Sequence, residues 1–536
     1  MSRQSLLASK DDFKYHQVKM APVKPEEAEV ESNQSNKSYQ HIISEAIGDM
    51  GRWQAFLIFA HFTPKIVMAW CMIIISFGGA KTDWWKRTME IDPITNETLY
   101  VNRLKDCSPL GINDSIVYDN TYTITAEWDL ICGLDYIPTW IKTSQMVGVM
   151  VGAGVLGQLG DWIGRQKCSW FAFTLSVVFI LIQAFSANWI MMMVCAFVVG
   201  IGLGGFLVLN SIYVLEYIGT SWRSAIGFIP FWASGVVILG GLYSLLPNWR
   251  HLCIASAITG APFIIFMWLT PESIRWLLQH GKTEQAVEVV EKIAKHNKRA
   301  KPDLTDLKAV ADQESSKLKE NALKYNYMTL FKFKATRWRC PLFGFFWFTC
   351  AYSYYALTFG VSLLSGNPAA NMSLMGVGEG CSLIMCWALT KKFGRKYTTV
   401  ILFTCTALSS FVITIGYATK AEDSETIKTV CALVSRLFLS GAWGSLIIYT
   451  VEIFPTMLRS SAYGFVSICG RIGGIVAPQS APLYDVAKHL PYTINGVLGG
   501  LCALGVLLLH DTATQDLQDK MDDDEEGDLK KEDTTV

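Results

Sequence analysis

The sequence contains few charged residues for its length and has no excess of either sign. Asp, Glu, Lys and Arg make up 17% of the 536 residues, and 46 basic side chains balance 46 acidic ones. This balance, together with an apolar content of 51%, excludes a disordered chain and a nucleic-acid-binding protein. The first fifty residues contain no apolar stretch of the kind found in a cleavable signal peptide, so we expect a cytosolic N-terminal tail.

Long apolar runs fill most of the remaining chain. The mean hydropathy is +0.28, and runs long enough to cross a hydrocarbon layer of ~30 Å recur between Trp53 and Leu509. We count twelve: 53–79, 138–160, 168–186, 189–214, 224–246, 250–270, 340–363, 372–390, 397–417, 429–450, 461–483 and 490–509. The predicted fold class is therefore all-α, a polytopic membrane protein with twelve transmembrane helices.

Basic residues of the short loops predict the orientation of these helices. Eight lie on the side of the N-terminal tail: Arg165, Lys167, Arg223, Lys391, Lys392, Arg395, Lys396 and Arg459. Four lie in short loops on the other side: Arg250, Lys420, Lys428 and Lys488. Because cytosolic loops are enriched in Lys and Arg, we predict a plasma-membrane protein with both termini in the cytosol.

The long loop of residues 80–137 then lies outside the cell. Asn96 and Asn113 begin Asn-x-Ser/Thr sequons, which are glycosylation acceptors on that side of the membrane. Cys107 and Cys132 lie in the same loop, where they form a disulfide or remain free. The other twelve cysteines lie mostly in apolar runs, where a thiol behaves as a small apolar group.

One basic residue lies deep inside an apolar run. Arg471 stands near the middle of residues 461–483, and at ~1.5 Å per helical residue it is ~15 Å from either end. A charge at that depth costs ~2.5 to 3.5 kcal/mol unless it faces a partner or a water-filled cavity. Arg471 therefore either forms a structural ion pair between helices or has a function near the centre of the membrane.

The two halves of the chain repeat the same short patterns. A Gly-Arg step follows the second run at Arg165 and the eighth run at Arg395, 230 residues later. A glutamate seven residues before an arginine follows the fourth and tenth runs, with an offset of 236 residues: Glu216 with Arg223, and Glu452 with Arg459. The near-equal offsets predict an internal duplication with two pseudo-symmetric halves of six helices each.

This duplication defines the expected domain organisation. We divide the chain into a cytosolic tail (1–52), an N-terminal half (53–270) that includes the extracellular loop, a cytosolic loop (271–339), a C-terminal half (340–509) and a cytosolic tail (510–536). Alternating apolar and charged residues between Ala286 and Lys295 predict a short amphipathic helix in the cytosolic loop.

The glycine-rich loop Gly157–Arg165, together with the repeat, resembles the signature of the major facilitator superfamily. The resemblance implies a gate of charged residues at the cytosolic face that pairs in one state and separates in the other. The residues expected to form this gate are Asp161, Arg165, Glu216, Arg223, Glu452 and Arg459. In the second half Lys391 stands where Asp161 would, so the gate there depends on Glu452 and Arg459 or is weaker.

Further stretches resemble the organic ion transporters, a family that handles organic cations, organic anions and carnitine. They follow in order along the chain: Glu127–Cys132, Pro247–Arg250, Pro271–Leu278 and Glu452–Thr456. In that family the position matching Arg471 is an acid in cation carriers and an arginine in anion and carnitine carriers. A guanidinium binds carboxylate or sulfate in a bidentate manner and repels a cation.

Other residues of the apolar runs complete the expected substrate site. Lys65, one turn from His61, adds a second positive charge if it faces the cavity, and Glu379 matches a carboxylate of the family. Tyr354 and Tyr355 match a tyrosine pair that lines the family's central cavity, and Trp232 offers another aromatic face. Aromatic residues in such runs are also used for packing. Two bases against one acid favour an anion or a zwitterion as the substrate.

Three classes of function remain open on these grounds. A secondary transporter with alternating access is favoured, because a duplication and charges at mid-membrane belong to that mechanism. A channel or receptor would need a filter repeated around a pore, and a membrane enzyme would need a metal cluster or a nucleophile with its acid and base. We expect no enzyme activity and no cofactor: Gly281-Lys282-Thr283 hints at a phosphate loop, but Trp276 replaces its first glycine.

We therefore predict a transporter of organic ions, with organic anions or zwitterions ahead of organic cations. A carrier of cations or carnitine in the same family is the main alternative, and a non-transporting receptor or sensor is a remoter one. The expected partners are a small organic ion and the lipid bilayer, with no nucleic acid. The final residues Thr534–Val536 have the form that PDZ domains bind by strand addition and carboxylate capture.

Overall fold

The computed structural model describes residues 39–91, 98–109, 114–219, 221–223, 229–300, 329–332, 334–420, 423–455 and 458–511. The predicted glycosylation sites Asn96 and Asn113 lie outside these described residues. The predicted PDZ ligand at Thr534–Val536 does so as well.

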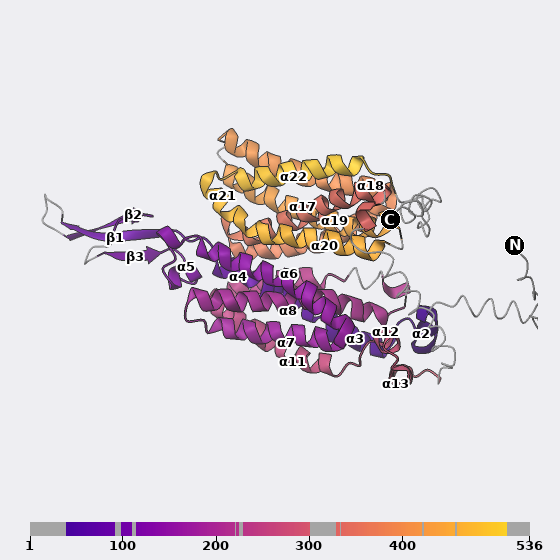
Figure 1. Ribbon diagram of the computed structural model, residues 1–536. Helices are drawn as coiled ribbons and strands as arrows, with labels where there is room; N and C mark the ends of the chain where they lie inside the picture. The colour runs from indigo at the N-terminus through magenta and orange to yellow at the C-terminus, as the bar shows by residue number, and fades with distance from the viewer. Residues whose placement is uncertain are drawn as a thin grey trace, which may run out of the picture.

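Two groups of helices lie side by side, one from each half of the chain (Figure 1). The N-terminal half contains α3 (Arg52–Phe62), α4 (Pro64–Gly78), α6 (Ile137–Ile163), α7 (Arg165–Ala184), α8 (Trp189–Glu216), α10 (Phe231–Leu245) and α11 (Trp249–Trp268). The C-terminal half contains α17 (Arg339–Phe359), α18 (Pro368–Ala418), α19 (Ser424–Ile453), α20 (Arg459–Val476), α21 (Ser480–Val486) and α22 (Leu490–Leu507). Single turns of 3-10 helix, η2 (Val361–Leu363) and η3 (Ala477–Gln479), follow α17 and α20.

Eight helical stretches in the described part of the chain are long and apolar enough to cross a membrane. One of them, α18, consists of two helices that meet at Gly394, where a φ of 75° interrupts the helical backbone. The helices α10, α17 and α20 occupy three further predicted runs. Within the described residues, each of the twelve predicted runs therefore overlaps a helix, consecutive short helices or one part of α18.

Glycines allow α6 and α8 to approach each other closely. A Cβ atom on Gly148 would lie 2.1 Å from the carbonyl oxygen of Phe197, and one on Gly204 would lie 2.1 Å from that of Val149. Gly200 and Gly204 are four residues apart, so they lie on one face of α8. Small residues at this spacing permit tight helix packing inside a membrane, where no hydrophobic force draws apolar helices together.

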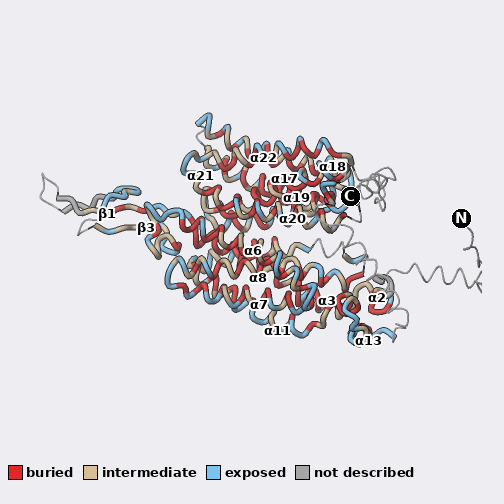
Figure 2. Tube along the Cα trace, viewed as in Figure 1, coloured by how far each residue is buried: buried red, intermediate tan, exposed pale blue. Residues whose placement is uncertain are grey.

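Large apolar side chains are exposed on the outer faces of both halves. Figure 2 shows buried residues along the inner faces of the helices and exposed residues along their outer faces. Ile258 is 68% exposed on α11, Ile384 70% on α18 and Leu504 63% on α22. Side chains of this kind are stable at such positions when lipid rather than water surrounds them, so the bundle surface fits the predicted bilayer.

A small antiparallel sheet projects from one end of the bundle, and the sequence analysis does not anticipate it (Figure 1). Its strands are β1 (Trp84–Ile91), β2 (Thr98–Leu104) and β3 (Ser115–Tyr118), in the order β2-β1-β3. We call this end of the bundle the sheet side. The loop sequence lacks the two-residue turn signals that would have revealed a hairpin.

Two contacts hold the sheet together and connect it to the bundle. A disulfide joins Cys107 to Cys132, which lies just before α6. The Lys86 ammonium, on the central strand, lies 3.0 Å from a carboxylate oxygen of Asp114, and both side chains are only 7% exposed. The short helix α5 (Ile124–Glu127) and the single turn η1 (Cys132–Leu134) then lead the chain back to α6.

The opposite end of the N-terminal half carries α2 (Tyr39–Ile47), α12 (Ile274–Gln279) and α13 (Thr283–His296) (Figure 1). We call this end the tail side. The helix α13 buries Ala286, Val290, Ile293 and Ala294, which confirms the amphipathic helix predicted there. Asn297, directly after α13, donates hydrogen bonds of 2.8 Å to the Ile47 carbonyl at the end of α2 and to the Gln54 side chain on α3. These bonds join α13, α2 and α3. Two single-turn helices, α15 (Thr329–Lys332) and α16 (Lys334–Arg337), precede α17.

Candidate functional site

A cavity of about 550 Å³ lies between the two halves, within the size range of small-molecule sites. The N-terminal half contributes, among others, Phe62, Lys65, Ser211, Arg223 and Trp232 to its wall. The C-terminal half contributes Tyr354, Tyr355, Glu379, Ser440 and Trp443. Five of the predicted substrate residues therefore meet at one cavity: Lys65, Trp232, Tyr354, Tyr355 and Glu379.

A chain of hydrogen bonds crosses the cavity wall from one half to the other. The indole N–H of Trp232 on α10 donates to the hydroxyl of Tyr354 on α17 at 2.9 Å. The Tyr354 hydroxyl in turn donates to Oε2 of Glu379 on α18 at 3.0 Å. The aromatic residues predicted to line the site thus also orient its carboxylate.

Arg436 contacts two of the predicted site residues, Glu379 and Tyr354, and the sequence analysis did not assign it to the site. Its Nη2 atom donates to Oε2 of Glu379 at 3.0 Å, and its guanidinium carbon lies 3.3 Å from the ring centroid of Tyr354. The Arg436 side chain is 1% exposed, and its Nη1 atom donates a hydrogen bond to the hydroxyl of Ser440 at 2.6 Å. A guanidinium this deep in α19 requires a partner, but the sequence does not reveal that its partner is Glu379, 57 residues earlier.

Lys65 faces the cavity from the first transmembrane segment. Its ammonium lies 3.7 Å from the ring centroid of Phe62 and 3.4 Å from the hydroxyl of Ser211. Among the described residues no carboxylate forms an ion pair with it. His61, one turn earlier, is fully buried and occupies both ring nitrogens with Asn210 at 2.8 Å and Thr270 at 3.0 Å, so it serves packing in this conformation.

Arg471 lies beside the cavity and not among the residues that line it. One guanidinium nitrogen donates to the carbonyl oxygen of Ser467 at 3.1 Å and also to the Ser467 hydroxyl, one turn earlier on α20. Gly474, one turn after Arg471 on the same helix, packs against the ring of Tyr355, which does line the cavity. The Nε atom of Arg471 is buried and makes no hydrogen bond to a described residue. The Arg471 guanidinium is therefore held by Ser467 of its own helix, and no acid among the described residues forms an ion pair with it.

The predicted gate residues of the N-terminal half meet on the tail side. Arg165, at the start of α7, forms an ion pair with Glu216 at the end of α8, and its Nη2 atom lies 3.6 Å from Asp161. The hydroxyl of Ser273 donates to the other oxygen of Glu216. The Nε atom of Arg223 donates to the carbonyl oxygen of Ile218 at 3.0 Å, and the Arg223 side chain lines the cavity.

Glu272 is a further acid of this group that the sequence analysis did not single out. Its carboxylate accepts the backbone N–H of Gln166 at 2.8 Å, in the first turn of α7, where the helix dipole favours negative charge. Gly164, directly before α7, has a φ of +131°, and a Cβ atom there would lie 2.2 Å from a Glu272 oxygen. A glycine is therefore required at this position for two separate reasons.

The C-terminal half contains an ion pair equivalent to that of Arg165 with Glu216. Both Nε and Nη2 of Arg395 lie 3.0 Å from Oε1 of Glu452, a contact that the sequence analysis did not predict when it assigned Glu452 and Arg459 to the gate. Arg395 and Glu452 are the repeat equivalents of Arg165 and Glu216. Arg459 starts α20, and its Nε and Nη2 atoms make no hydrogen bond to a described residue. The duplication is thus preserved as a pair of matching ion pairs.

The halves contact each other on the sheet side. Lys81, directly after the first transmembrane segment, donates to the carbonyl oxygen of Ala481 at 3.1 Å and forms an ion pair with Asp485 on α21. Gln479 donates to the hydroxyl of Thr143 on α6 at 3.2 Å. These contacts lie opposite the tail side, toward which the cavity extends as far as Arg223.

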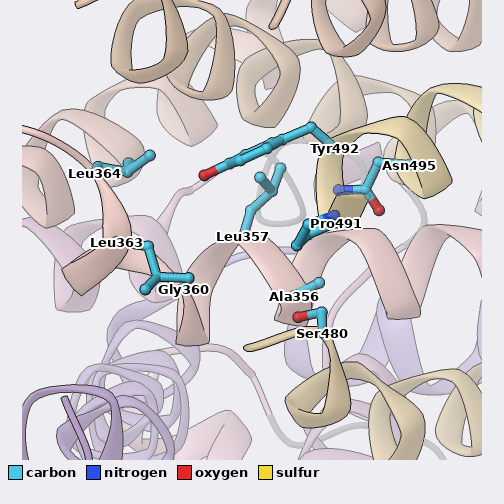
Figure 3. A pocket seen from close by; sticks show the side chains of 9 residues that line it. All are labelled: Ala356, Leu357, Gly360, Leu363, Leu364, Ser480, Pro491, Tyr492 and Asn495. Atoms are coloured by element: carbon cyan, nitrogen blue, oxygen red, sulfur yellow. The ribbon is translucent and has the colours of Figure 1, made fainter. Parts of the chain in front are cut away.

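A second cavity on the sheet side is far smaller. It measures about 20 Å³ between α17, α21 and α22, which is room for one water molecule (Figure 3). Tyr492 and Asn495 line it together with apolar residues of α17. The two halves thus contact each other on the sheet side, and the large cavity extends toward the tail side as far as Arg223.

Comparisons with known proteins agree with this architecture. The family described as "Sugar (and other) transporter" matches residues 108–510. Solute carrier family 22 member 7 of Rattus norvegicus is 31% identical over 416 residues, which cover 77% of this chain and 76% of the relative. The chain belongs to solute carrier family 22 of the major facilitator superfamily. An organic cation transporter protein of Drosophila melanogaster is 26% identical over 434 residues, or 79% of this chain and 77% of that protein.

Solved structures show the same fold. The xylose transporter XylE of E. coli, in a partially occluded inward open conformation, aligns with a TM-score of 0.62 at 16% identity. The alignment covers 87% of this chain and 100% of that chain. The resemblance to the major facilitator superfamily and to its organic ion transporters is confirmed, and so is the prediction that this protein is a membrane transporter. The roles assigned to individual site residues stay predictions.

Proposed function

We propose that this member of solute carrier family 22 carries organic anions or zwitterions across the plasma membrane by alternating access. In this proposal the sheet side is extracellular and the tail side cytosolic, as the basic short loops indicate. The two halves rock about the cavity, which then opens to each side in turn. The described conformation corresponds to the state that opens toward the cytosol.

The observation that carries the proposal is the arrangement of charge around the cavity. Glu379 is the acid in the cavity wall, and Arg436 already neutralises it at 3.0 Å. The Lys65 ammonium stands in the opposite wall without a carboxylate partner among the described residues. A substrate entering this cavity therefore meets an available positive charge and an acid that is already paired, which favours a substrate with an anionic group.

Arg471 is the second base of the proposed site. Its tether to Ser467 lies within one turn of its own helix, so a change of side-chain rotamer is enough to release it. Gly474, one turn later, packs against the ring of Tyr355, because a Cβ atom there would lie 3.3 Å from that ring. The guanidinium is thus positioned to reach the cavity beside Tyr355 when an anionic substrate offers it a better acceptor than a neutral hydroxyl.

The ion pairs on the tail side form the proposed gate. In the described conformation Arg165 pairs with Glu216 and Arg395 with Glu452, so each arginine bonds within its own half. We infer that Asp161, Arg223 and Arg459 complete the gate when the tail side closes, since all three lie at the same membrane face. Closure would offer these side chains partners from the opposite half.

An organic cation is the second candidate substrate. The relative from Drosophila melanogaster is named an organic cation transporter protein, and Glu379 does line the cavity. For Glu379 to bind a cation, Arg436 would have to withdraw from a site in which it is 1% exposed. Removing the partner of a buried charge costs about 3 to 5 kcal/mol, so we place the cation second.

Uptake into cells that express the protein tests the proposal. The probes are 6-carboxyfluorescein as an anion, carnitine as a zwitterion and tetraethylammonium as a cation. We expect saturable uptake of the anion or the zwitterion, and faster uptake when the same compound is preloaded inside, as an alternating carrier requires. Robust uptake of tetraethylammonium with no uptake of the other two would overturn the charge assignment. Uptake that preloading does not change would argue for a channel, and no uptake at all would favour a receptor or sensor.

The proposed orientation has its own measurement. If residues 80–137 are extracellular, peptide N-glycosidase should reduce the apparent mass of the protein from intact cells, and Asn96→Gln with Asn113→Gln should abolish the shift. The C-terminal residues Thr534–Val536 would then be cytosolic, where a PDZ domain could bind them. Deleting Val536 should abolish such binding, because that mode requires the terminal carboxylate.

A further inference from the structure

Lys142 is a buried base with no acidic partner among the described residues. It lies on α6 near the sheet side, is 4% exposed and donates to the carbonyl oxygen of Gly79 at 2.9 Å. An ammonium has three donors, so one neutral acceptor satisfies it poorly. A buried base of this kind is costly to keep inside a membrane protein and is expected to have a function.

The surroundings of Lys142 place it directly beneath the contact between the halves. The adjacent residue, Thr143, accepts a hydrogen bond from Gln479 of the C-terminal half at 3.2 Å. The Gly79 carbonyl that accepts from Lys142 lies only two residues before Lys81 in the chain, so the two ammonium groups lie at the same end of the first transmembrane segment. Lys81 in turn forms the ion pair with Asp485 across the same contact. Lys142 and Lys81 thus lie at the same contact between the halves, and the acid that pairs with Lys81, Asp485, belongs to the opposite half.

The surroundings of Lys142 and Lys81 must change when the transporter switches from opening on the tail side to opening on the sheet side. Opening the sheet side separates Lys81 from Asp485 and Thr143 from Gln479, because each pair joins the two halves. Water then reaches Lys142, and two like charges are left together without the carboxylate that one of them held. Two adjacent ammonium groups facing water attract an anionic group and can both donate hydrogen bonds to it.

We propose that Lys142 and Lys81 form an extracellular receiving site for the carboxylate or sulfate group of the substrate when the sheet side is open. The site lies about fourteen residues of helix from Lys65, or ~20 Å, so it is separate from the central cavity and precedes it on the way in. When the sheet side closes, Asp485 replaces the substrate on Lys81, and the anion moves on toward Lys65. This inference rests on the proposed anion or zwitterion specificity.

The test compares uptake and efflux of 6-carboxyfluorescein in cells that express Lys142→Gln. Loss of one charge-assisted contact should raise the KM for external substrate about tenfold. The KM for efflux of preloaded substrate should stay within about twofold, because an anion leaving the cytosol reaches the central cavity first. Lys142→Arg should restore the external KM. The matched control is Lys488→Gln, which removes an exposed positive charge, 63% exposed, on the same side.

Two further variants separate a receiving site from a mere latch. Asp485→Asn breaks the ion pair but leaves both lysines in place, so the external KM should fall or stay the same. Lys81→Gln breaks the same pair and should raise the external KM. Equal effects of the two variants would mean that the pair acts only as a latch, and the inference would be overturned.

If the Lys142→Gln variant does not reach the cell surface, chemical labelling of the wild-type protein tests the inference instead. A membrane-impermeant acetylating reagent, sulfosuccinimidyl acetate, should modify Lys142 in intact cells while the transporter cycles, and external 6-carboxyfluorescein should reduce that modification. A Lys142 that is never acetylated would contradict its predicted exposure. If wild-type protein takes up neither anion nor zwitterion, the proposed function itself fails. If it does and Lys142→Gln keeps the wild-type external KM, only the receiving site fails.

Discussion

The indole N–H of Trp232 lies 2.9 Å from the hydroxyl oxygen of Tyr354, and this hydrogen bond joins α10 of one half to α17 of the other at the wall of the cavity. The same hydroxyl donates to Glu379, which in turn is paired with Arg436. The cavity wall is therefore a connected polar chain across the two halves, in which each member fixes the orientation of the next.

Removing the members of this chain should have effects that do not add. Trp232→Phe keeps an aromatic ring and deletes one hydrogen bond of about 0.5 to 1.5 kcal/mol, so the KM for uptake should rise severalfold. Tyr354→Phe deletes two bonds and should raise it further. The double variant should match Tyr354→Phe alone, because the bond from Trp232 is already absent there. Strictly additive changes in the logarithm of KM would show that the two residues act independently.

The pair of Glu379 and Arg436 should be more important for stability than for substrate binding. Glu379→Gln leaves a guanidinium that is 1% exposed without its charge partner, which should cost about 3 to 5 kcal/mol. We expect a lower thermal midpoint for the purified transporter, measured by heating followed by size-exclusion chromatography. Glu379→Gln combined with Arg436→Gln should recover most of the loss, since no unpaired charge remains. A single variant as stable as wild type would mean that water or another group already screens this pair.

Arg471 should decide whether an anion is carried. Arg471→Asp reverses the charge beside Tyr355, and uptake of 6-carboxyfluorescein or carnitine should disappear while the protein still reaches the cell surface. Arg471→Lys keeps the charge without the bidentate geometry and should retain part of the activity. As a control, Ser467→Ala removes one acceptor that holds the guanidinium in place, so it should leave uptake intact or increase it. Unchanged anion uptake by Arg471→Asp would remove Arg471 from the site.

The sequence predicted the transmembrane helices and the halves because both depend on long, repeated signals. Apolar runs of about twenty residues leave few alternatives in a membrane, and the offset of 230 residues from Arg165 to Arg395 is nearly equal to that of 236 residues from Glu216 to Glu452. It did not predict which of these charges pair, because Glu452 has an arginine seven residues later in sequence, whereas its partner in space is Arg395, 57 residues earlier.

Contacts between residues that lie far apart in the sequence account for other features of the structure that the sequence analysis did not predict. The sequence places Arg436 toward the outer end of the run 429–450, and both its burial and its pairing with Glu379 depend on how α18 and α19 pack. Lys142 stands in an apolar run like Lys65, and only the structure shows that it bonds to the Gly79 carbonyl, next to the contact between the halves. The strands β1 to β3 were missed because their turns lack the Gly or Asn pairs that mark tight hairpins.

The two matching ion pairs on the tail side allow a prediction that compares one half with the other. Glu216 and Arg165 have side chains that are 8% and 13% exposed, whereas those of Glu452 and Arg395 are 19% and 31% exposed. Loss of either glutamate removes the buried acid that its arginine contacts, although Arg165 keeps Asp161 at 3.6 Å. The penalty grows with burial, because water solvates an exposed guanidinium and screens its charge. Glu216→Gln should therefore lower the thermal midpoint and the rate of uptake more than Glu452→Gln does.

Substitution of Gly164, directly before α7, tests how far the backbone conformation next to the Arg165 ion pair contributes to stability. Alanine at this position would have a φ of +131°, and its Cβ atom would clash with Glu272, the acid that accepts the N–H of Gln166 at the start of α7. Gly164→Ala should therefore reduce both stability and uptake, whereas Gly154→Ala, where a Cβ atom meets nothing within 4 Å, should have little effect. Adding Glu272→Ala to Gly164→Ala should relieve the clash but not the backbone strain, so it should restore only part of the loss. Full recovery would assign the entire effect to the side chain of Glu272, and no recovery would assign it to the backbone.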